Sequence, residues 1–329
     1  MAWLLPLLLC SFLSYRVRGW KLDASCTQMG VGDHIRDGMA GAFDMVDSAH
    51  RRLTATPRAA DTDELIGHLF AKEGQKSSEV DMWKTQSLFE NINLYYRNEL
   101  TADQEPDWKN IVVFCNLDRF QKVQGRINVY RDKTSGILYS YSQQSCKGAS
   151  DWVALAVTSN PMDKNIDGMV EENRKPTQLQ LCPWFIDWIK NKEYKFHRDV
   201  RRTNIGQHVI KAAESSKYGF RQIDVFSLLD KVLLHEMTHG RSIFTTKWDK
   251  KVKEGLMDVT DPSFLGFGLP AYGWKRAVSL AKKGEDLGKR RAADNNAETI
   301  ALFASACLLL DQTDKPRKVD AKGNVIPRT

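Results

Sequence analysis

Two histidines four residues apart are the first feature of this sequence that could do chemistry. His235 and His239 frame the segment His-Glu-Met-Thr-His, and four residues make about one turn of an α-helix. Their imidazoles would share one helix face and bind a single metal ion, with Glu236 beside them to accept a proton from metal-bound water. Chance can also produce such a motif, but this one follows an apolar run that predicts the helix it needs. The pattern favours a catalytic zinc site.

A catalytic zinc site needs a third protein ligand besides the two histidines and leaves a fourth position for water. No histidine follows His239 in the sequence, so the third ligand is predicted to be a carboxylate. Sequence spacing alone does not choose among the acidic residues that follow the motif. These candidates are Asp249, Glu254, Asp258, Asp261, Glu285, Asp286, Asp294 and Glu298.

Further motifs surround this segment in a characteristic order. They are Cys26, Thr56–Arg58, a predicted strand that ends at Cys115, Leu181–Phe185, the pair Tyr272-Gly273, and Asn296-Ala297-Glu298 at the start of an apolar run. This order resembles the deuterolysin-like zinc endopeptidases, or aspzincins, which include the fungal lysine-specific metalloendopeptidases. The likeness covers most of residues 24–310. It implies a zincin-like fold, a fungal source and no separate propeptide.

The resemblance also implies roles for individual residues. His235 and His239 match the ligands of one zinc ion per chain, and Glu236 matches the general base. Tyr272 matches the tyrosine that donates a hydrogen bond to the oxyanion, although an aromatic packed at a helix start is the simpler alternative. In the family the third ligand is an aspartate three residues before this tyrosine, and here that position is Leu269.

An aspartate from the long segment after His239 is therefore expected to complete the zinc site. Asp258 is the first choice, because its apolar neighbours suit a carboxylate held at a partly buried metal. Asp261 is the second choice, although it precedes a proline and fits a turn. Glu298 is the third alternative.

Glu298 has a different role under the family resemblance. It aligns with an acidic residue that helps the lysine-specific members accept a basic side chain, so it is predicted to bind the substrate. The second acidic position of the family is Ala301 here, which weakens the expectation of a strict lysine preference. The alternative is that Glu298 complements the dipole of the helix it begins.

The elements that must position these residues can also be predicted. Asp224 is a plausible N-cap for a helix that runs through the apolar segment to His239 and stops at Gly240. Further helices are expected at His34–Leu53, Asp61–Phe70, Glu79–Asn98 and Ile300–Leu310. Strands of one sheet are expected at Asn110–Cys115, Ile127–Tyr130, Ile137–Tyr141, Trp152–Val157 and Leu179–Cys182.

Helices before and after a small group of strands indicate one α+β domain, in which helices surround a small mixed sheet. We place this domain at residues 20–313. Residues 314–329 are polar, contain two prolines and are predicted to be a flexible tail. Residues 1–19 contain a short apolar run and small residues before a cut after Gly19, so they are predicted to be a signal peptide.

Cleavage after Gly19 would remove two arginines and lower the formal charge from +7 to +5. Five cysteines would remain, without metal-binding spacing. In a secreted protein they predict two disulfides and one free thiol, which we assign to Cys307 in an apolar run.

The sequence thus predicts a secreted, monomeric zinc endopeptidase that acts on polypeptides and, once processed, does not bind membranes. The basic clusters are not interleaved with aromatic residues, so nucleic acid is not an expected partner. One alternative is a secreted zinc-binding protein that lost activity and acts by interaction. Another is a structural or adhesion module in which the histidine motif is accidental.

Overall fold

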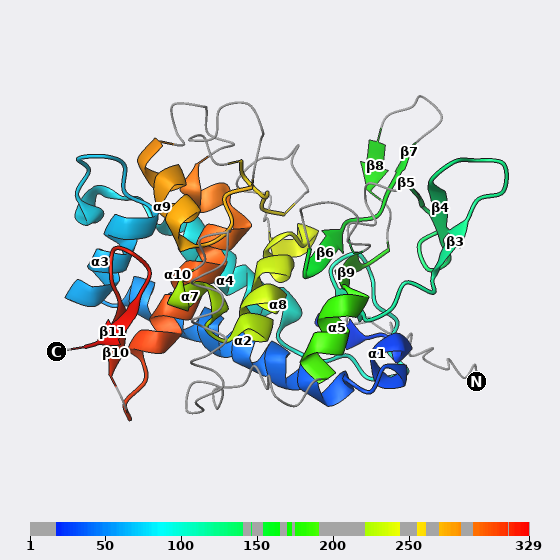
Figure 1. Ribbon diagram of the computed structural model, residues 1–329, viewed down its shortest axis with the longest axis horizontal. Coiled ribbons are helices and arrows are strands. Elements are labelled where there is room, and N and C mark those ends of the chain that lie inside the picture. The colour runs from blue at the N-terminus through cyan, green and yellow to red at the C-terminus, as the bar shows by residue number, and fades with distance from the viewer. Residues whose placement is uncertain are drawn as a thin grey trace, which may run out of the picture.

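The computed structural model describes residues 18–140, 146, 154–164, 170–172, 175–190, 221–243, 255–260, 270–283, 292–314 and 316–328. Residues 1–17 of the predicted signal peptide lie outside this set, and so does Asp261. The described residues contain no helix that is both long and apolar enough to cross a membrane. Helices gather at one end of the molecule and most strands at the other, which fits the predicted α+β class (Figure 1).

Three helices pack together at the centre of the molecule. The amphipathic α2 (Gly32–Thr54) contacts both α8 (Leu228–Thr238) and α10 (Ala297–Leu310). Almost every residue of α10 is buried, because this helix is apolar on all sides. Around them lie α1 (Ala24–Gln28), α3 (Ala60–Leu69), η1 (Ser77–Glu79), α4 (Trp83–Tyr96), α5 (Pro183–Lys190), α7 (Gln222–Val225), η6 (Arg241–Ile243), α9 (Trp274–Lys283) and η9 (Ala293–Asn295).

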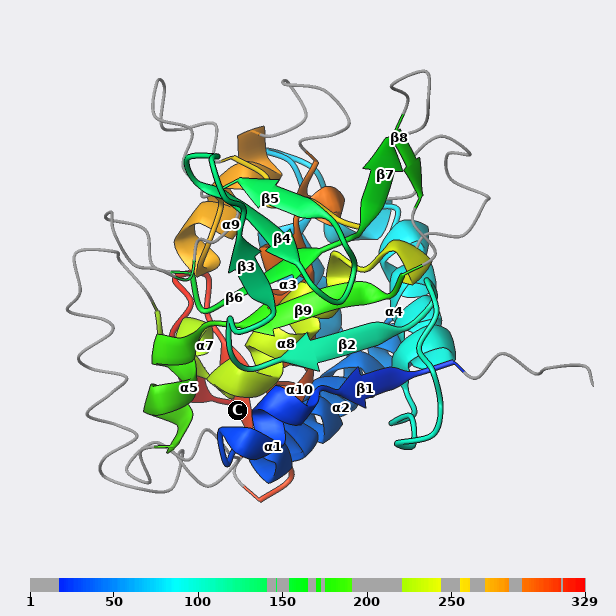
Figure 2. The ribbon, with the colours of Figure 1, turned by 90° about the vertical axis from the view of Figure 1, so that its right-hand side faces the viewer.

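A mixed four-stranded sheet lies against these helices. Its strands, in the order of the sheet, are β1 (Trp20–Leu22), β2 (Ile111–Phe114), β9 (Thr177–Leu181) and β6 (Ala156–Ser159). The first three are parallel, whereas β6 runs antiparallel to β9. Every residue of β2 and β9 is buried, and Figure 2 shows the sheet in front of α8 and α2. The strand β6 forms the edge that contacts α8.

The prediction that all strands belong to one sheet is wrong for the segments Ile127–Tyr130 and Ile137–Tyr141. The strands β3 (Phe120–Lys122), β4 (Val129–Asp132) and β5 (Leu138–Ser140) form a separate antiparallel sheet. Two further strands, β7 (Met162–Lys164) and β8 (Val170–Glu172), pair with each other. The residues of β3 and β4 are mostly exposed or half-buried, so they do not share the buried character of β2 and β9.

The end of the chain is folded rather than loose. The strands β10 (Arg317–Val319) and β11 (Val325–Pro327) form an antiparallel hairpin within the region predicted to be a flexible tail. Val319 is buried in the large hydrophobic cluster, which also includes Trp20. Lys318 and Arg328 form ion pairs with acidic residues of α3. These contacts attach a polar segment to the core of the predicted domain.

Two disulfides connect distant parts of the chain. Cys26 of α1 is bonded to Cys115, which follows β2, and Cys146 is bonded to Cys182, which follows β9. Among the described cysteines Cys307 is a free thiol, buried within α10. The predicted two disulfides and the predicted unpaired residue are confirmed.

Candidate metal centre

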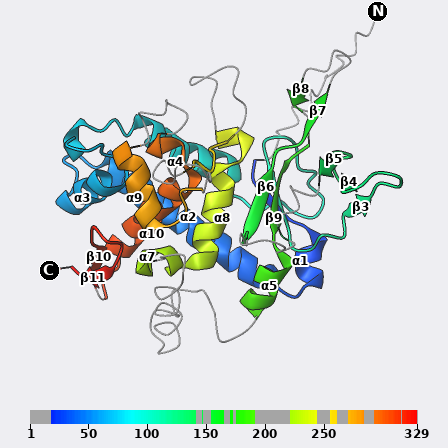
Figure 3. The same cartoon turned by 45° about the horizontal axis from the view of Figure 1, so that its top comes forward.

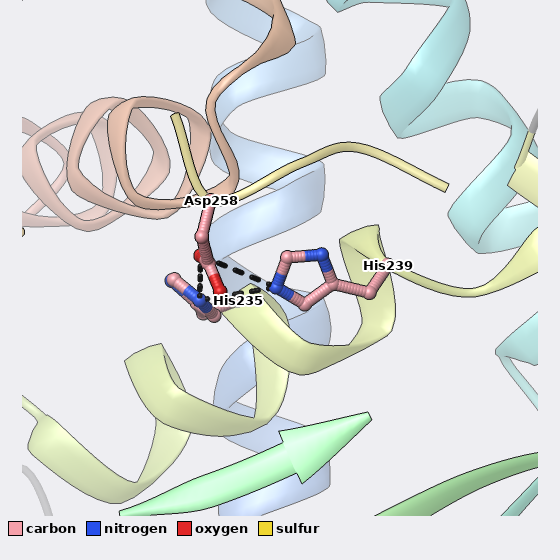
Figure 4. Close-up of side chains that lie close together, drawn as sticks. All are labelled: His235, His239 and Asp258. Atoms are coloured by element: carbon pink, nitrogen blue, oxygen red, sulfur yellow. Dashed lines mark hydrogen bonds and ion pairs between the residues drawn. The ribbon is translucent and has the colours of Figure 1, made fainter. Parts of the chain in front are cut away.

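The last turn of α8 presents two imidazoles to the same point in space. His235 lies on the helix and His239 is its C-cap residue, and their Nε2 atoms are 3.3 Å apart. An oxygen of Asp258 lies 3.1 Å from Nε2 of His235 and 3.4 Å from Nε2 of His239. The three side chains converge from two segments of the chain (Figure 4). Together they form a group of metal-binding geometry, with ligand atoms within 4.8 Å of one another.

Backbone hydrogen bonds hold the Asp258 segment in place on both sides. The amide of Leu256 donates to the carbonyl of Thr238 at the end of α8, with a distance of 2.8 Å. On the other side, the carbonyl of Met257 accepts from the amide of Ala297, at the start of α10, with a distance of 3.0 Å. The position of Asp258 is therefore fixed by both helices.

A glycine allows this segment to approach the helix end. A Cβ atom at Gly255 would lie 2.1 Å from the carbonyl carbon of His239, which is closer than two such atoms can come. Any other residue at this position would push the segment, and Asp258 with it, away from the histidines.

The partners of the two histidines define which ring nitrogens face the centre. Nδ1 of His239 lies 2.7 Å from the carbonyl oxygen of Leu256, and Nδ1 of His235 lies 3.0 Å from a carboxylate oxygen of Glu298. Both partners only accept hydrogen bonds, so each Nδ1 must carry the proton. In the neutral rings the lone pairs of both Nε2 atoms then point at the centre, as metal ligands require.

The electrostatics of the centre favour a bound cation. Burial alone would raise the pKa of Asp258, but the two histidines outweigh it and hold that pKa well below its usual range. Burial alone would lower the pKa of His235 and of His239, whereas the neighbouring carboxylates raise both. The carboxylate of Asp258 is therefore charged, and both imidazoles bind a positive charge, either a proton or a metal ion, more readily than a free imidazole would. A divalent metal ion fits this donor set of two nitrogens and one oxygen.

Glu236 lies on α8 beside the centre and is held by the edge strand of the sheet. The hydroxyl of Thr158, on β6, lies 2.7 Å from a carboxylate oxygen of Glu236 and 3.0 Å from its carbonyl oxygen. The side-chain amide of Asn160, just after β6, donates to the carbonyl of His239 at 2.8 Å. These bonds join the edge strand to the helix turn that carries the site, and β6 runs beside α8 in Figure 3.

Tyr272 lies next to the metal-binding group, as the sequence predicts. Its ring centroid is 5.7 Å from that of His235, and the residue remains 37% exposed. Burial, followed by the charge of Asp258, raises the pKa of the phenol. The hydroxyl therefore stays protonated at neutral pH and can donate a hydrogen bond.

Glu298 does not occupy the position predicted for a substrate-binding residue. Only 6% of it is exposed, and both of its oxygens contact groups inside the protein. It also does not replace Asp258 as third ligand, because it contacts Nδ1 of His235 and not Nε2. The reason is the packing of α10 against α8, which points the carboxylate into the protein. Burial raises the pKa of Glu298, but Lys231 and His235 outweigh it and bring it to about 2.

Two residues near the centre have no counterpart in the sequence predictions. Lys231 lies one helical turn before His235, and a lysine within an apolar helical run was a usable signal that a buried partner exists. Thr158 gives no such signal, because its contact with Glu236 spans 78 positions of the chain.

Comparisons with protein-family models, with curated proteins and with solved structures find no match to this chain. The resemblance to the deuterolysin-like endopeptidases therefore stays a prediction. The structure itself shows helices and small sheets around a His-His-Asp group with the geometry of a metal site, in which His235 is buried, His239 half-buried and Asp258 exposed.

Proposed function

We propose that this chain is a secreted zinc-dependent endopeptidase with a zincin-like fold. The observation that carries the proposal is the convergence of His235, His239 and Asp258 on one point, next to Glu236 on the same helical turn. Two imidazoles and a carboxylate are a donor set typical of catalytic zinc, which leaves one position for water. The two disulfides support an oxidising compartment outside the cytosol.

The residues of the site have distinct roles under this proposal. His235, His239 and Asp258 would hold one zinc ion, which supplies a Lewis acid and an acidified water. Glu236 would accept a proton from the attacking water and deliver it to the leaving amine. Tyr272 donates a hydrogen bond to the oxygen that becomes negative during attack on the peptide carbonyl.

The sheet beside the centre supports a polypeptide as the substrate. Among the described strands β6 is paired on one side only, with β9, and it contacts α8. An extended peptide can add to such an edge through backbone hydrogen bonds. Thr158 and Asn160 attach this edge to the helix turn with the histidines, so a bound peptide would lie close to them.

The variant Glu236→Gln tests the proposal, with His235→Ala as its matched control. Gln keeps the size of the side chain but does not accept the proton, so hydrolysis of an unfolded, fluorescently labelled protein should fall about 10²–10⁴-fold. Elemental analysis should find one zinc per chain in the wild type and in Glu236→Gln, and none in His235→Ala. Unchanged hydrolysis in Glu236→Gln would refute the mechanism.

The same measurements separate the proposal from its main alternative, a zinc-binding protein that acts by interaction. The departure from the family at Leu269 is the feature that favours the alternative. One zinc per wild-type chain, without any cleavage between pH 4 and 10, would support it.

A further inference from the structure

The carboxylate of Glu298 is a buried junction between three parts of the protein. One oxygen lies 3.0 Å from Nδ1 of His235. The other accepts from the ammonium of Lys231 at 3.1 Å and from the amide of Gly273 at 3.2 Å. One side chain thus contacts a candidate metal ligand, a buried lysine and the turn that carries Tyr272.

All three partners of Glu298 are hydrogen-bond donors. A carboxylate is the side-chain group that offers two acceptor oxygens and no proton, so it can satisfy all three together. The ammonium of Lys231 is as buried as the carboxylate, with side-chain exposures of 6% and 8%. A buried ammonium needs a counter-charge, and Glu298 supplies it.

We propose that Glu298 is a positioning residue that fixes both the ring of His235 and the Tyr272–Gly273 turn, with Lys231 as its counter-charge. The inference rests on the proposed function in one respect, which is that His235 binds the metal. It replaces the predicted contact with a basic substrate side chain, because the carboxylate is already occupied inside the protein.

The variant Glu298→Gln separates positioning from simple packing. An amide has one acceptor oxygen and one donor nitrogen. If its oxygen faces His235, its NH₂ group meets Lys231 and Gly273, which are both donors. If the amide is reversed, NH₂ faces Nδ1 of His235 and moves the ring proton to Nε2, which then cannot bind a metal. Either orientation weakens the site.

Adding Lys231→Met to Glu298→Gln should change metal affinity in the opposite direction to Glu298→Gln itself. Removing the lysine leaves the glutamine free to turn its oxygen toward His235, with one opposing donor fewer. The double variant should therefore bind metal more tightly than Glu298→Gln alone. If Glu298 has only a structural role, adding Lys231→Met should weaken metal binding further.

The experiment measures zinc affinity by competition with a chromophoric chelator, and the visible spectrum of the cobalt-substituted protein. Glu298→Gln should bind zinc about 10–100-fold more weakly than the wild type and show an altered cobalt spectrum. Asp132→Asn is the matched control, because Asp132 is a fully buried carboxylate on β4 that pairs with Arg119. It should keep both the affinity and the spectrum.

Each result supports or overturns the inference. Wild-type affinity and an unchanged spectrum in Glu298→Gln would overturn it and leave the proposed function intact. A wild type without metal would overturn both. If Glu298→Gln does not fold, the double variant, which removes both buried charges, must still bind zinc more weakly than the wild type. Binding equal to the wild type would overturn the inference.

Discussion

The hydroxyl of Thr158 is the contact that sets the direction of the Glu236 carboxylate. The hydroxyl belongs to the edge strand β6, not to α8 itself, and lies 2.7 Å from a carboxylate oxygen of Glu236. A general base must be oriented toward the water that it deprotonates. A residue without any reactive group of its own thus contributes to the candidate site.

The variant Thr158→Val should lower kcat about tenfold, because it removes one hydrogen bond to a charged group at nearly constant size. Thr158→Ser, which keeps the hydroxyl, should recover most of the rate. Steady-state kinetics on a fluorogenic peptide would measure both, together with the zinc content. Equal rates for the valine variant and the wild type would show that Glu236 does not need this contact.

For single residues, the sequence predicts which side chains share a face within one helical turn. It does not predict side-chain orientations that depend on how two helices pack together. The spacing of His235 and His239 fixes a shared face, and the apolar neighbours of Asp258 favoured it as the third ligand. The buried orientation of Glu298 depends on how α10 packs against α8, which no local pattern records. The same packing decides that Glu298 is the partner of Lys231.

The junction before α8 differs from the helix start that the sequence predicts. Asp224 was expected to cap one continuous helix, but it lies within the short α7. The helix is interrupted at Ser227, which has a φ of 45° and precedes α8. The carboxylate of Asp224 instead accepts from the amides of Arg221, at 2.5 Å, and Trp274, at 2.7 Å. It therefore joins α7 to the first residue of α9.

The substitution Asp224→Asn should change the pH dependence of stability. Burial raises the pKa of Asp224 to about 6 in the folded protein, from 3.8. A raised carboxyl pKa stabilises the fold fully below the unfolded value, and this contribution is lost as the pH rises through 6. Asparagine stays neutral at every pH, so between pH 4 and pH 7 the stability of the variant relative to the wild type should rise by up to ~3 kcal/mol. A constant cost for the one acceptor oxygen that asparagine lacks would add to the difference equally at both pH values.

Chemical denaturation at pH 4 and pH 7 would measure this difference. Asp132→Asn provides a control of opposite sign. Burial tends to raise the pKa of Asp132, but bonds from Thr134 and Gln178 and the charge of Arg119 lower it overall. Its contribution is therefore present at neutral pH and is lost on acidification. A constant difference between Asp224→Asn and the wild type across this range would contradict the prediction.

The accuracy of the predicted elements follows the strength of their apolar pattern. The predicted helix at 34–53 is extended by two residues at its start and one at its end in α2, because its buried face repeats with helical spacing. The strand β2 is also predicted closely, as a continuous apolar run, whereas β9 begins at Thr177, two residues before the predicted start, because its sequence alternates polar and apolar residues. The hairpin at the chain end was missed, because Val319 is the one fully buried residue in its two strands.

The candidate centre joins separate segments of the chain within residues 235–272. The histidines belong to α8, Asp258 to a segment bonded to both α8 and α10, and Tyr272 to the turn before α9. A bound ion would therefore act as a cross-link within the helical part. Since binding to the folded state alone stabilises it by mass action, metal loss should affect the whole fold.

Removal of the metal should lower the midpoint of thermal unfolding by about 10 °C. This value assumes zinc at 1,000 times its dissociation constant, which is worth about 4 kcal/mol. It takes the lower part of the range of about 2–4 °C per kcal/mol that holds for domains of 150–250 residues, because this chain is larger. Differential scanning calorimetry with and without a chelator would measure the shift. Added Zn²⁺ should restore the midpoint and Mg²⁺ should not, because imidazole is a poor ligand for magnesium. An unchanged midpoint would argue against a bound metal.

The close approach at Gly255 has a consequence for finding other chains with this arrangement. Among such chains the distance along the sequence from the second histidine to the acid can vary, because the free energy of closing a loop rises only slowly with its length. What is constrained is a glycine three positions before the acid, where the backbone touches the helix end. A pattern that requires a fixed gap between histidine and aspartate would overlook this chain. A pattern that pairs His-Glu-x-x-His with a later Gly-x-x-Asp, at any separation, describes it.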